Sequence, residues 1–132
     1  MADSDNGIRR LASDHSVAST LDRLEALLKE RNVTIFARID FAADAAKAGL
    51  SMAPEQQLIF GAPKAGTPLM RASATTALDL PLRAICWRDG DGNTWLAYND
   101  PAYIVKRHGL PTELEKNLAA VIPLLERATK KE

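Results

Sequence analysis

The run Asp89-Gly90-Asp91-Gly92-Asn93 is the feature that most limits the folds open to this chain. It lies between residues 82–88 and residues 94–99, two segments whose residue pattern is typical of strands. Glycine and aspartate supply the backbone conformations that a tight turn requires. The pattern therefore predicts a β-hairpin, and a β-hairpin brings antiparallel strands into the sheet that contains it.

Other strands and a first helix follow from the spacing of apolar residues. A strand is expected over residues 33–40, where β-branched and aromatic residues dominate, and shorter strands over residues 8–13 and 57–60. A helix is expected after Ser16, its N-cap. Its buried stripe recurs at spacings of four, three and four: Val17, Leu21, Leu24 and Leu28.

Later helix starts are marked by capping residues. Asp40 precedes an alanine-rich segment, and Thr67 and Asp100 each stand before a proline, which is favoured at the first helical position. Residues 112–115 have the sequence pattern of a capping box, which predicts the start of the last helix. Pro123 predicts a kink or a break in that helix. We expect an α+β fold, a single domain with a mainly antiparallel sheet and helices packed on one face.

The composition excludes several classes of protein. The 17 Lys plus Arg balance the 17 Asp plus Glu, so no basic field favours nucleic acid, and no apolar run is long enough for a membrane span. The single cysteine excludes an internal disulfide and a cysteine-rich zinc site. We expect a flexible arm over residues 1–6, one domain over residues 7–128 and a solvated tail over residues 129–132. The acidic start lacks a secretory signal, so we expect a cytoplasmic protein. No metal or cofactor motif is found in the sequence, so we also expect neither a metal nor a cofactor.

The loop over residues 60–70 is the candidate ligand site. It contains Gly61, Lys64 and Gly66 and leads to the helix start expected at Thr67. A helix N-terminus attracts anions, and Lys64 adds a full positive charge. The alternative is a plain strand-to-helix connection with a solvated lysine. Polar residues at two strand ends complete the candidate set: Asp40, Tyr98, Asn99 and Asp100.

Both faces of the expected sheet carry apolar side chains. Strict alternation places Phe36 and Arg38 opposite the aliphatic residues of their strand, and the hairpin adds Arg83, Trp87 and Trp95. Helices on one face leave these residues exposed, and aromatic residues with arginine are typical of protein interfaces. We expect this face to be buried in a homodimer. The alternative is that the long C-terminal segment covers it.

Three further groups of residues are of types that often take part in chemistry, but their sequence context favours structural roles. The hairpin turn has acidic residues at calcium-ligand spacing, but Thr94 stands where a calcium loop requires glycine. His15 and His108 are expected to be surface or helix-end residues, because neither lies in a ligand spacing. Cys86 lies in an apolar strand without a nearby base, so we expect a buried structural thiol.

Four motifs together resemble the bacterial domain-of-unknown-function family 302. They are Ile39-Asp40, residues 60–70, residues 78–82 and residues 98–101, and the similarity runs from about Gly7 to about Leu125. The resemblance implies a small α+β domain of bacteria or archaea with no established activity. This chain has Phe41 and Ala62 where the family typically has His and Asn. Any metal or proton chemistry that used those two residues is therefore expected to be lost here.

Three functions compete at this level. The first is a noncatalytic domain that binds a small molecule, with an anionic ligand as one version, and acts as a homodimer. The second is an enzyme of unknown class that uses Asp40 or Asp100 as an acid or base, with Lys64 or Tyr98 assisting. The third is a single-stranded nucleic-acid platform, which the zero net charge and few aromatic residues oppose. We favour the first hypothesis.

Overall fold

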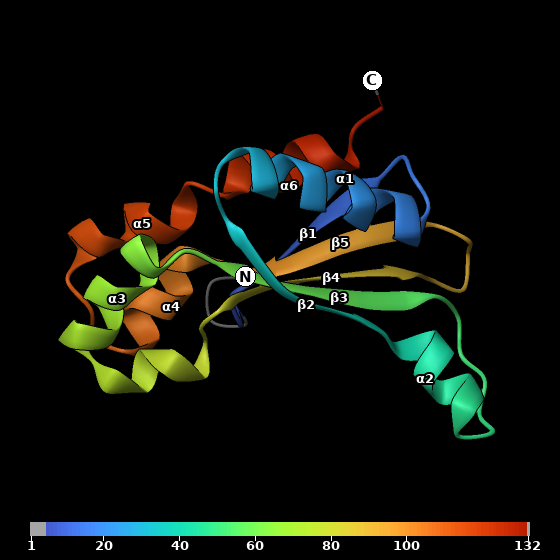
Figure 1. Cartoon of the computed structure of the whole chain (residues 1–132), viewed down its shortest axis with the longest axis horizontal. Helices are drawn as coiled ribbons and strands as arrows, with labels where there is room; N and C mark the ends of the chain where they lie inside the picture. Colours follow the sequence, from blue (N-terminus) through green and yellow to red (C-terminus); the bar gives the residue numbers. More distant parts are fainter. Residues whose placement is uncertain (1–4, 132) are drawn as a thin grey trace.

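Five strands form one antiparallel sheet in the order β1-β5-β4-β3-β2, in a computed structural model that describes residues 5–131 (Figure 1). The hairpin of β4 and β5 has the predicted bounds, and the Asp89 side chain accepts hydrogen bonds from the N–H groups of Asp91 and Asn93 in its turn. The α+β class is therefore confirmed. The strands are β1 Ile8–Ser13, β2 Thr34–Asp40, β3 Glu55–Gly61, β4 Leu82–Arg88 and β5 Thr94–Asn99.

Two helices cover one face of this sheet and form the helical layer. They are α1 Val17–Glu30 and α6 Ile122–Thr129, which lie side by side above the strands in Figure 1. Ser16 caps α1 as predicted, because its hydroxyl accepts the N–H of Ser19. The apolar stripe of α1 is buried against the strands. The main core of the molecule lies there and includes Leu21, Leu24, Leu28, Leu58, Phe60, Cys86, Leu96 and Leu125.

A second group of short helices, the end group, packs beyond one end of the sheet (Figure 1). It comprises α3 Pro63–Ala72, η2 Ala74–Leu78, α4 Pro101–Arg107, η3 Thr112–Leu114 and α5 Glu115–Ala119. The remaining helix, α2 Phe41–Lys47, projects from the opposite end of the sheet. The end group has its own apolar cluster, which is Leu69, Ile104, Val105, Leu110 and Leu118. Leu82 packs against both clusters and joins them.

Two predicted helix starts are wrong. Helix α3 begins at Pro63, with Ala62 as its N-cap, so Thr67 lies inside the helix. Pro63 takes the first helical position, where its missing N–H costs nothing. The capping box over residues 112–115 does not form, because Thr112 is already in a 3₁₀ turn and an N-cap needs extended backbone. The break predicted at Pro123 is confirmed, since α5 ends at Ala119 and α6 begins at Ile122.

A β-bulge at Phe36 overturns the expected alternation of β2. Ile35 pairs with Phe60 and Ala37 pairs with Ile59, which leaves Phe36 as an extra residue. Beyond the bulge, Arg38 faces the helical layer instead of the exposed face. The prediction that Arg38 belongs to an interface is therefore wrong, because a bulge moves every later side chain to the other face.

The C-terminal segment also differs from its prediction. Thr129 is buried in the last turn of α6, and its carbonyl accepts the N–H of Asp14. The N–H of Lys131 donates to the Asp14 carboxylate at 2.9 Å. The expected solvated tail is thus bonded to the loop before α1 as far as it is described. The predicted N-terminal arm lies mostly outside the described residues, and Asp5 and Asn6 accept backbone hydrogen bonds from Gly7 and Ile8.

No helix among residues 5–131 combines the length and the apolar character that crossing a membrane requires.

Candidate functional site

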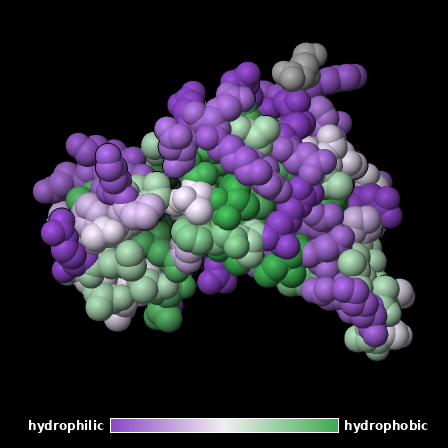
Figure 2. All heavy atoms as spheres, viewed as in Figure 1, coloured by the Kyte–Doolittle hydropathy of each residue, from purple (hydrophilic) through white to green (hydrophobic). Residues whose placement is uncertain are grey.

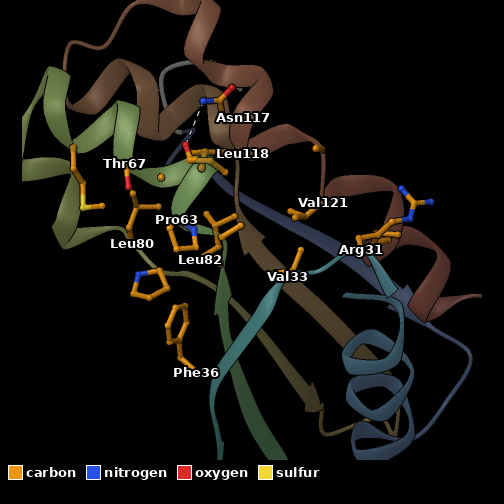
Figure 3. A pocket seen from close by; sticks show the side chains of 18 residues that line it. Arg31, Val33, Phe36, Pro63, Thr67, Leu80, Leu82, Asn117, Leu118 and Val121 are labelled. Carbon is orange, nitrogen blue, oxygen red and sulfur yellow. Dashed lines mark hydrogen bonds between the residues drawn. The ribbon is translucent and has the colours of Figure 1, made fainter. Parts of the chain in front are cut away.

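A cavity of about 430 Å³ lies where the end group meets the helical layer (Figure 3). Its walls come from the start of β2, the junction of β3 and α3, the segment that leads into β4, and the connection from α5 to α6. Hydrophobic residues also reach the molecular surface in the middle of Figure 2, bordered above by hydrophilic ones. The lining is mainly apolar and includes Val33, Phe36, Pro63, Met70, Leu80, Pro81, Leu82, Leu118, Val121 and Leu124.

Small residues keep this space open. Ala62, Ala65 and Gly66 all line the cavity and lie on one side of the first turn of α3, because helical residues three and four apart share a face. Gly61 precedes them at the end of β3. A Cβ atom on Gly61 would lie 3.5 Å from Cβ of Pro81 and 3.6 Å from Cε2 of Phe36. Larger side chains at these positions would occupy the cavity.

Few polar side chains reach the cavity. Asn117 donates from Nδ2 to the carbonyl of Ala65 at 3.3 Å, which ties α5 to α3 (Figure 3). Thr67 lines the wall from α3 and is exposed. Arg31, at the C-cap of α1, is the one charged residue in the lining. No carboxylate lines the cavity, and none among the described residues pairs with Arg31.

The predicted ligand residues are divided between the cavity and distant places. Gly61, Gly66 and Thr67 line the cavity. Lys64 is exposed on α3 and is not part of the lining. Tyr98 and Asn99 instead border a much smaller recess of about 10 Å³ on the other side of Leu82.

The two carboxylates proposed as an acid or base do not share a site. Asp40 ends β2 and caps α2, because its side chain accepts the N–H of Ala43 at 2.9 Å. Asp100 follows β5 and caps α4, and its Oδ2 accepts from Nε of Arg9 at 2.9 Å. Neither residue lines the cavity. Each carboxylate accepts a backbone N–H at the start of a helix. The enzymatic alternative therefore has no site in which the two carboxylates lie together.

Two ionisable side chains of the sheet, Cys86 and Tyr98, are poorly suited to nucleophilic chemistry. Burial raises the pKa of the Cys86 thiol to about 11, so this thiol stays protonated at neutral pH. Burial also raises the pKa of Tyr98, and the nearby Glu126 and Asp100 carboxylates add to the effect. Among residues 5–131, no three His, Cys, Asp or Glu side chains gather closely enough to hold a metal ion.

The sheet face opposite the helical layer, called the open face here, carries most of the predicted interface residues. Alternation from the buried residues of β3, β4 and β5 places Arg83, Trp87 and Trp95 there. Phe36 at the bulge is 54% exposed. The guanidinium of Arg10 lies 5.4 Å above the Trp87 ring. Helix α6 packs on the other face, so the alternative in which the C-terminal segment covers the open face is wrong.

Comparison with known proteins finds one family and several relatives. The family described as "Domain of unknown function DUF302" matches residues 9–126. Two proteins named "Fluoride-specific ion channel FluC 1", from Brucella suis and Brucella abortus, are each 42% identical over 118 residues. These matches cover 89% of this chain and 46% and 44% of the relatives, so the chain spans less than half of their length.

A solved structure has the same fold. It is an uncharacterized conserved DUF302 protein from Bacillus stearothermophilus, with a TM-score of 0.77 and 16% sequence identity. The match covers 95% of this chain and 97% of that one. At this identity the likeness supports the architecture of the sheet and helices.

Proposed function

The chain belongs to the DUF302 family, as its motifs predicted, and from that premise we propose that it is a domain whose cavity binds a small apolar molecule carrying one acidic group without catalysing a reaction on it. The cavity beside α3 is the observation that carries this proposal. Its volume lies within the roughly 300–1,000 Å³ of small-molecule sites, and its lining has their composition, mainly apolar with a few polar groups.

The acidic group of the ligand follows from the charges around the cavity. Arg31 is the one charged residue in the lining, and no carboxylate there competes for it. A guanidinium binds a carboxylate or phosphate through charge-assisted hydrogen bonds that contribute about 1.5–3 kcal/mol each. Because Arg31 is exposed, solvent screening places its contribution near the lower end of that range. In this proposal Arg31, and not Lys64, supplies the positive charge that pairs with the ligand.

Isothermal titration with decanoate and with methyl decanoate tests both parts of the proposal. We expect decanoate to bind about tenfold more tightly than the ester, because only the acid pairs with Arg31. Arg31→Gln should remove this difference, whereas Lys64→Gln, which removes the same charge outside the cavity, should keep it. Ala120 lines the cavity where the lining is exposed to solvent, so Ala120→Trp should block both ligands. Absence of binding by either compound would refute the binding function, and equal binding would refute the acidic group.

We also propose that the protein is a homodimer that buries the open face. Aromatic residues with arginine are enriched at interface centres, and Trp87, Trp95 and Arg83 have this composition. Native mass spectrometry measures the assembly state directly. We expect a dimer that Trp87→Glu converts to a monomer, because a buried unpaired carboxylate is costly. A monomeric wild type would contradict this part of the proposal. The cytoplasmic location stays a prediction.

A second candidate function is regulation of an ion-transporting assembly. The observation that favours it is the similarity to less than half of proteins named fluoride-specific ion channels. In this version, the matched segment of those relatives is a separate domain that alters transport by the rest of the chain. Deleting that segment from the Brucella suis relative and measuring fluoride efflux from vesicles tests it. Unchanged efflux would count against this second function.

A further inference from the structure

A hydroxyl, an imidazole and a carboxylate lie in series on the end group, away from the lining of the large cavity. His108 follows α4, Thr75 lies in η2, and Asp79 follows η2. Nδ1 of His108 lies 2.9 Å from Oγ1 of Thr75. Nε2 of the same ring lies 2.6 Å from Oδ2 of Asp79. One imidazole therefore joins an alcohol to a carboxylate through both of its nitrogens.

Elementary chemistry fixes the direction of these hydrogen bonds when the imidazole is neutral. An ionised carboxylate only accepts, so Nε2 carries the proton and donates it to Asp79. Nδ1 is then the unprotonated nitrogen, and it accepts the hydroxyl proton of Thr75. Ser73 can donate in turn to Thr75, because their hydroxyl oxygens are 3.1 Å apart. The Thr75 hydroxyl is thus already directed at a base.

Activation of an alcohol requires a base that is held in place and an alcohol that a reagent can reach, and the three side chains differ in exposure accordingly. The His108 side chain is 4% exposed and the Asp79 side chain 15% exposed, whereas Thr75 is exposed. Arg107 holds the other side of the arrangement, since its Nη1 lies 3.1 and 3.0 Å from the two oxygens of Asp79. The base and its carboxylate are held in place, and the alcohol is open to a reagent.

We propose that Thr75 is a nucleophilic hydroxyl that takes an acyl group from small activated esters, with His108 as its general base and Asp79 as the positioning residue of the imidazole. A nucleophile bonded to a base, and the base bonded to an orienting group, is the arrangement that activates an alcohol. His108 is the C-cap residue of α4 through its backbone N–H, which leaves its ring free for other partners. Both ring nitrogens of His108 bond side chains outside that helix.

The reaction step balances within these groups. Oγ1 of Thr75 attacks the ester carbonyl while Nδ1 of His108 takes the hydroxyl proton. The carbon–oxygen bond to the leaving group then breaks, and the leaving alkoxide takes that proton from Nδ1. The products are an ester of Thr75 and a free alcohol. Asp79 stays ionised throughout and stabilises the transient imidazolium.

Incubation of the full chain with p-nitrophenyl acetate tests the proposal through p-nitrophenol release and peptide mass spectrometry. We expect an acetyl group on Thr75. Thr75→Val, which removes only the hydroxyl, should abolish that adduct, and Thr75→Ser should keep it. His108→Gln should slow its formation about a hundredfold or more, the usual effect of removing a general base. Asp79→Asn should slow it, and Asp79→Glu should restore part of the rate because it keeps the carboxylate.

Two matched controls separate this chemistry from nonspecific acetylation. His15→Gln removes the other histidine of the chain, whose Nε2 bonds the carbonyl of Lys130, and should leave the Thr75 adduct unchanged. Thr112→Val removes an exposed hydroxyl of the same end group, in η3, that is not bonded to His108, and should also leave the Thr75 adduct unchanged. Acetylation confined to lysines would overturn the proposal. Equal labelling of Thr75 in His108→Gln would overturn it too.

Discussion

Among the glycines of the chain, Gly7 has the least room for a side chain. Its φ of +81° lies in the left-handed region, and a Cβ atom there would overlap the ring and Cβ of Tyr103. Gly109 provides a matched comparison, because its φ is +62° and a Cβ atom there would meet nothing within 4 Å beyond its chain neighbours. The two glycines therefore share a conformational cost and differ in steric cost.

We predict that Gly7→Ala lowers the free energy of unfolding by clearly more than Gly109→Ala does. The second change should cost about 1–2 kcal/mol, the penalty for a left-handed alanine. The first adds the displacement of Tyr103. Urea denaturation measures both values. Equal losses would show that Tyr103 moves aside without cost.

The reactivity of the Cys86 thiol reports whether the sheet beneath α1 is buried. It is fully buried in the main core, and burial raises its pKa to about 11. We predict that iodoacetamide at pH 8 leaves the native thiol unmodified and alkylates it in urea, because the thiolate is the reactive form. Rapid alkylation of the native protein would contradict the position of β4 beneath α1.

At the scale of elements, Arg38 decides how β2 and α1 are joined. Its Nη1 bonds the carboxylates of Asp22 at 2.6 Å and Glu25 at 2.9 Å, and its Nε bonds Gln56 at 2.9 Å. The side chain is 24% exposed. These contacts exist because the bulge at Phe36 turns Arg38 toward the helical layer. They tie the first helix to an edge strand.

We predict that Arg38→Met lowers the free energy of unfolding by about 1.5–3 kcal/mol, the usual contribution of hydrogen bonds to charged groups. Arg71→Met is the control, since Arg71 is exposed in the last turn of α3, away from the open face, and no carboxylate is bonded to it among the described residues. Its effect should stay within about 0.5 kcal/mol. Thermal or urea unfolding distinguishes the two variants, and the reverse order would contradict the bulge.

At the scale of the whole molecule, two apolar clusters meet at Leu82, and residues of both clusters line the large cavity. Leu24 is buried in the main cluster and Leu69 in that of the end group. We predict that Leu24→Ala and Leu69→Ala each lower the stability by about 2–5 kcal/mol and shift one common transition. Tryptophan fluorescence reports the sheet and circular dichroism the helices. Separate transitions in Leu69→Ala would show that the end group unfolds by itself.

Features set by a few neighbouring residues could be predicted from the sequence. The hairpin turn, the caps at Ser16, Asp40 and Asp100, and the break near Pro123 all depend on local backbone preferences. The open face was also predictable in part, because the aromatic residues of β4 and β5 alternate with core residues. The loop at residues 61–67 was singled out because it combines two glycines and a lysine with an expected helix start. Most of that loop lines the cavity, but Lys64 does not.

The tertiary structure decided what depends on distant partners. Strand pairing placed the bulge at Phe36 and so moved Arg38 to the covered face. Packing of α1 against α6 brought Arg31 to the cavity, and packing of α4 against η2 joined His108 to Thr75 and Asp79. Local propensity acts over a few residues, whereas register, coverage of a face and the meeting of side chains far apart in the chain are set by burial. The sequence therefore determined most of the elements and the caps at Ser16, Asp40 and Asp100, and the folded structure alone determined which side chains share a site.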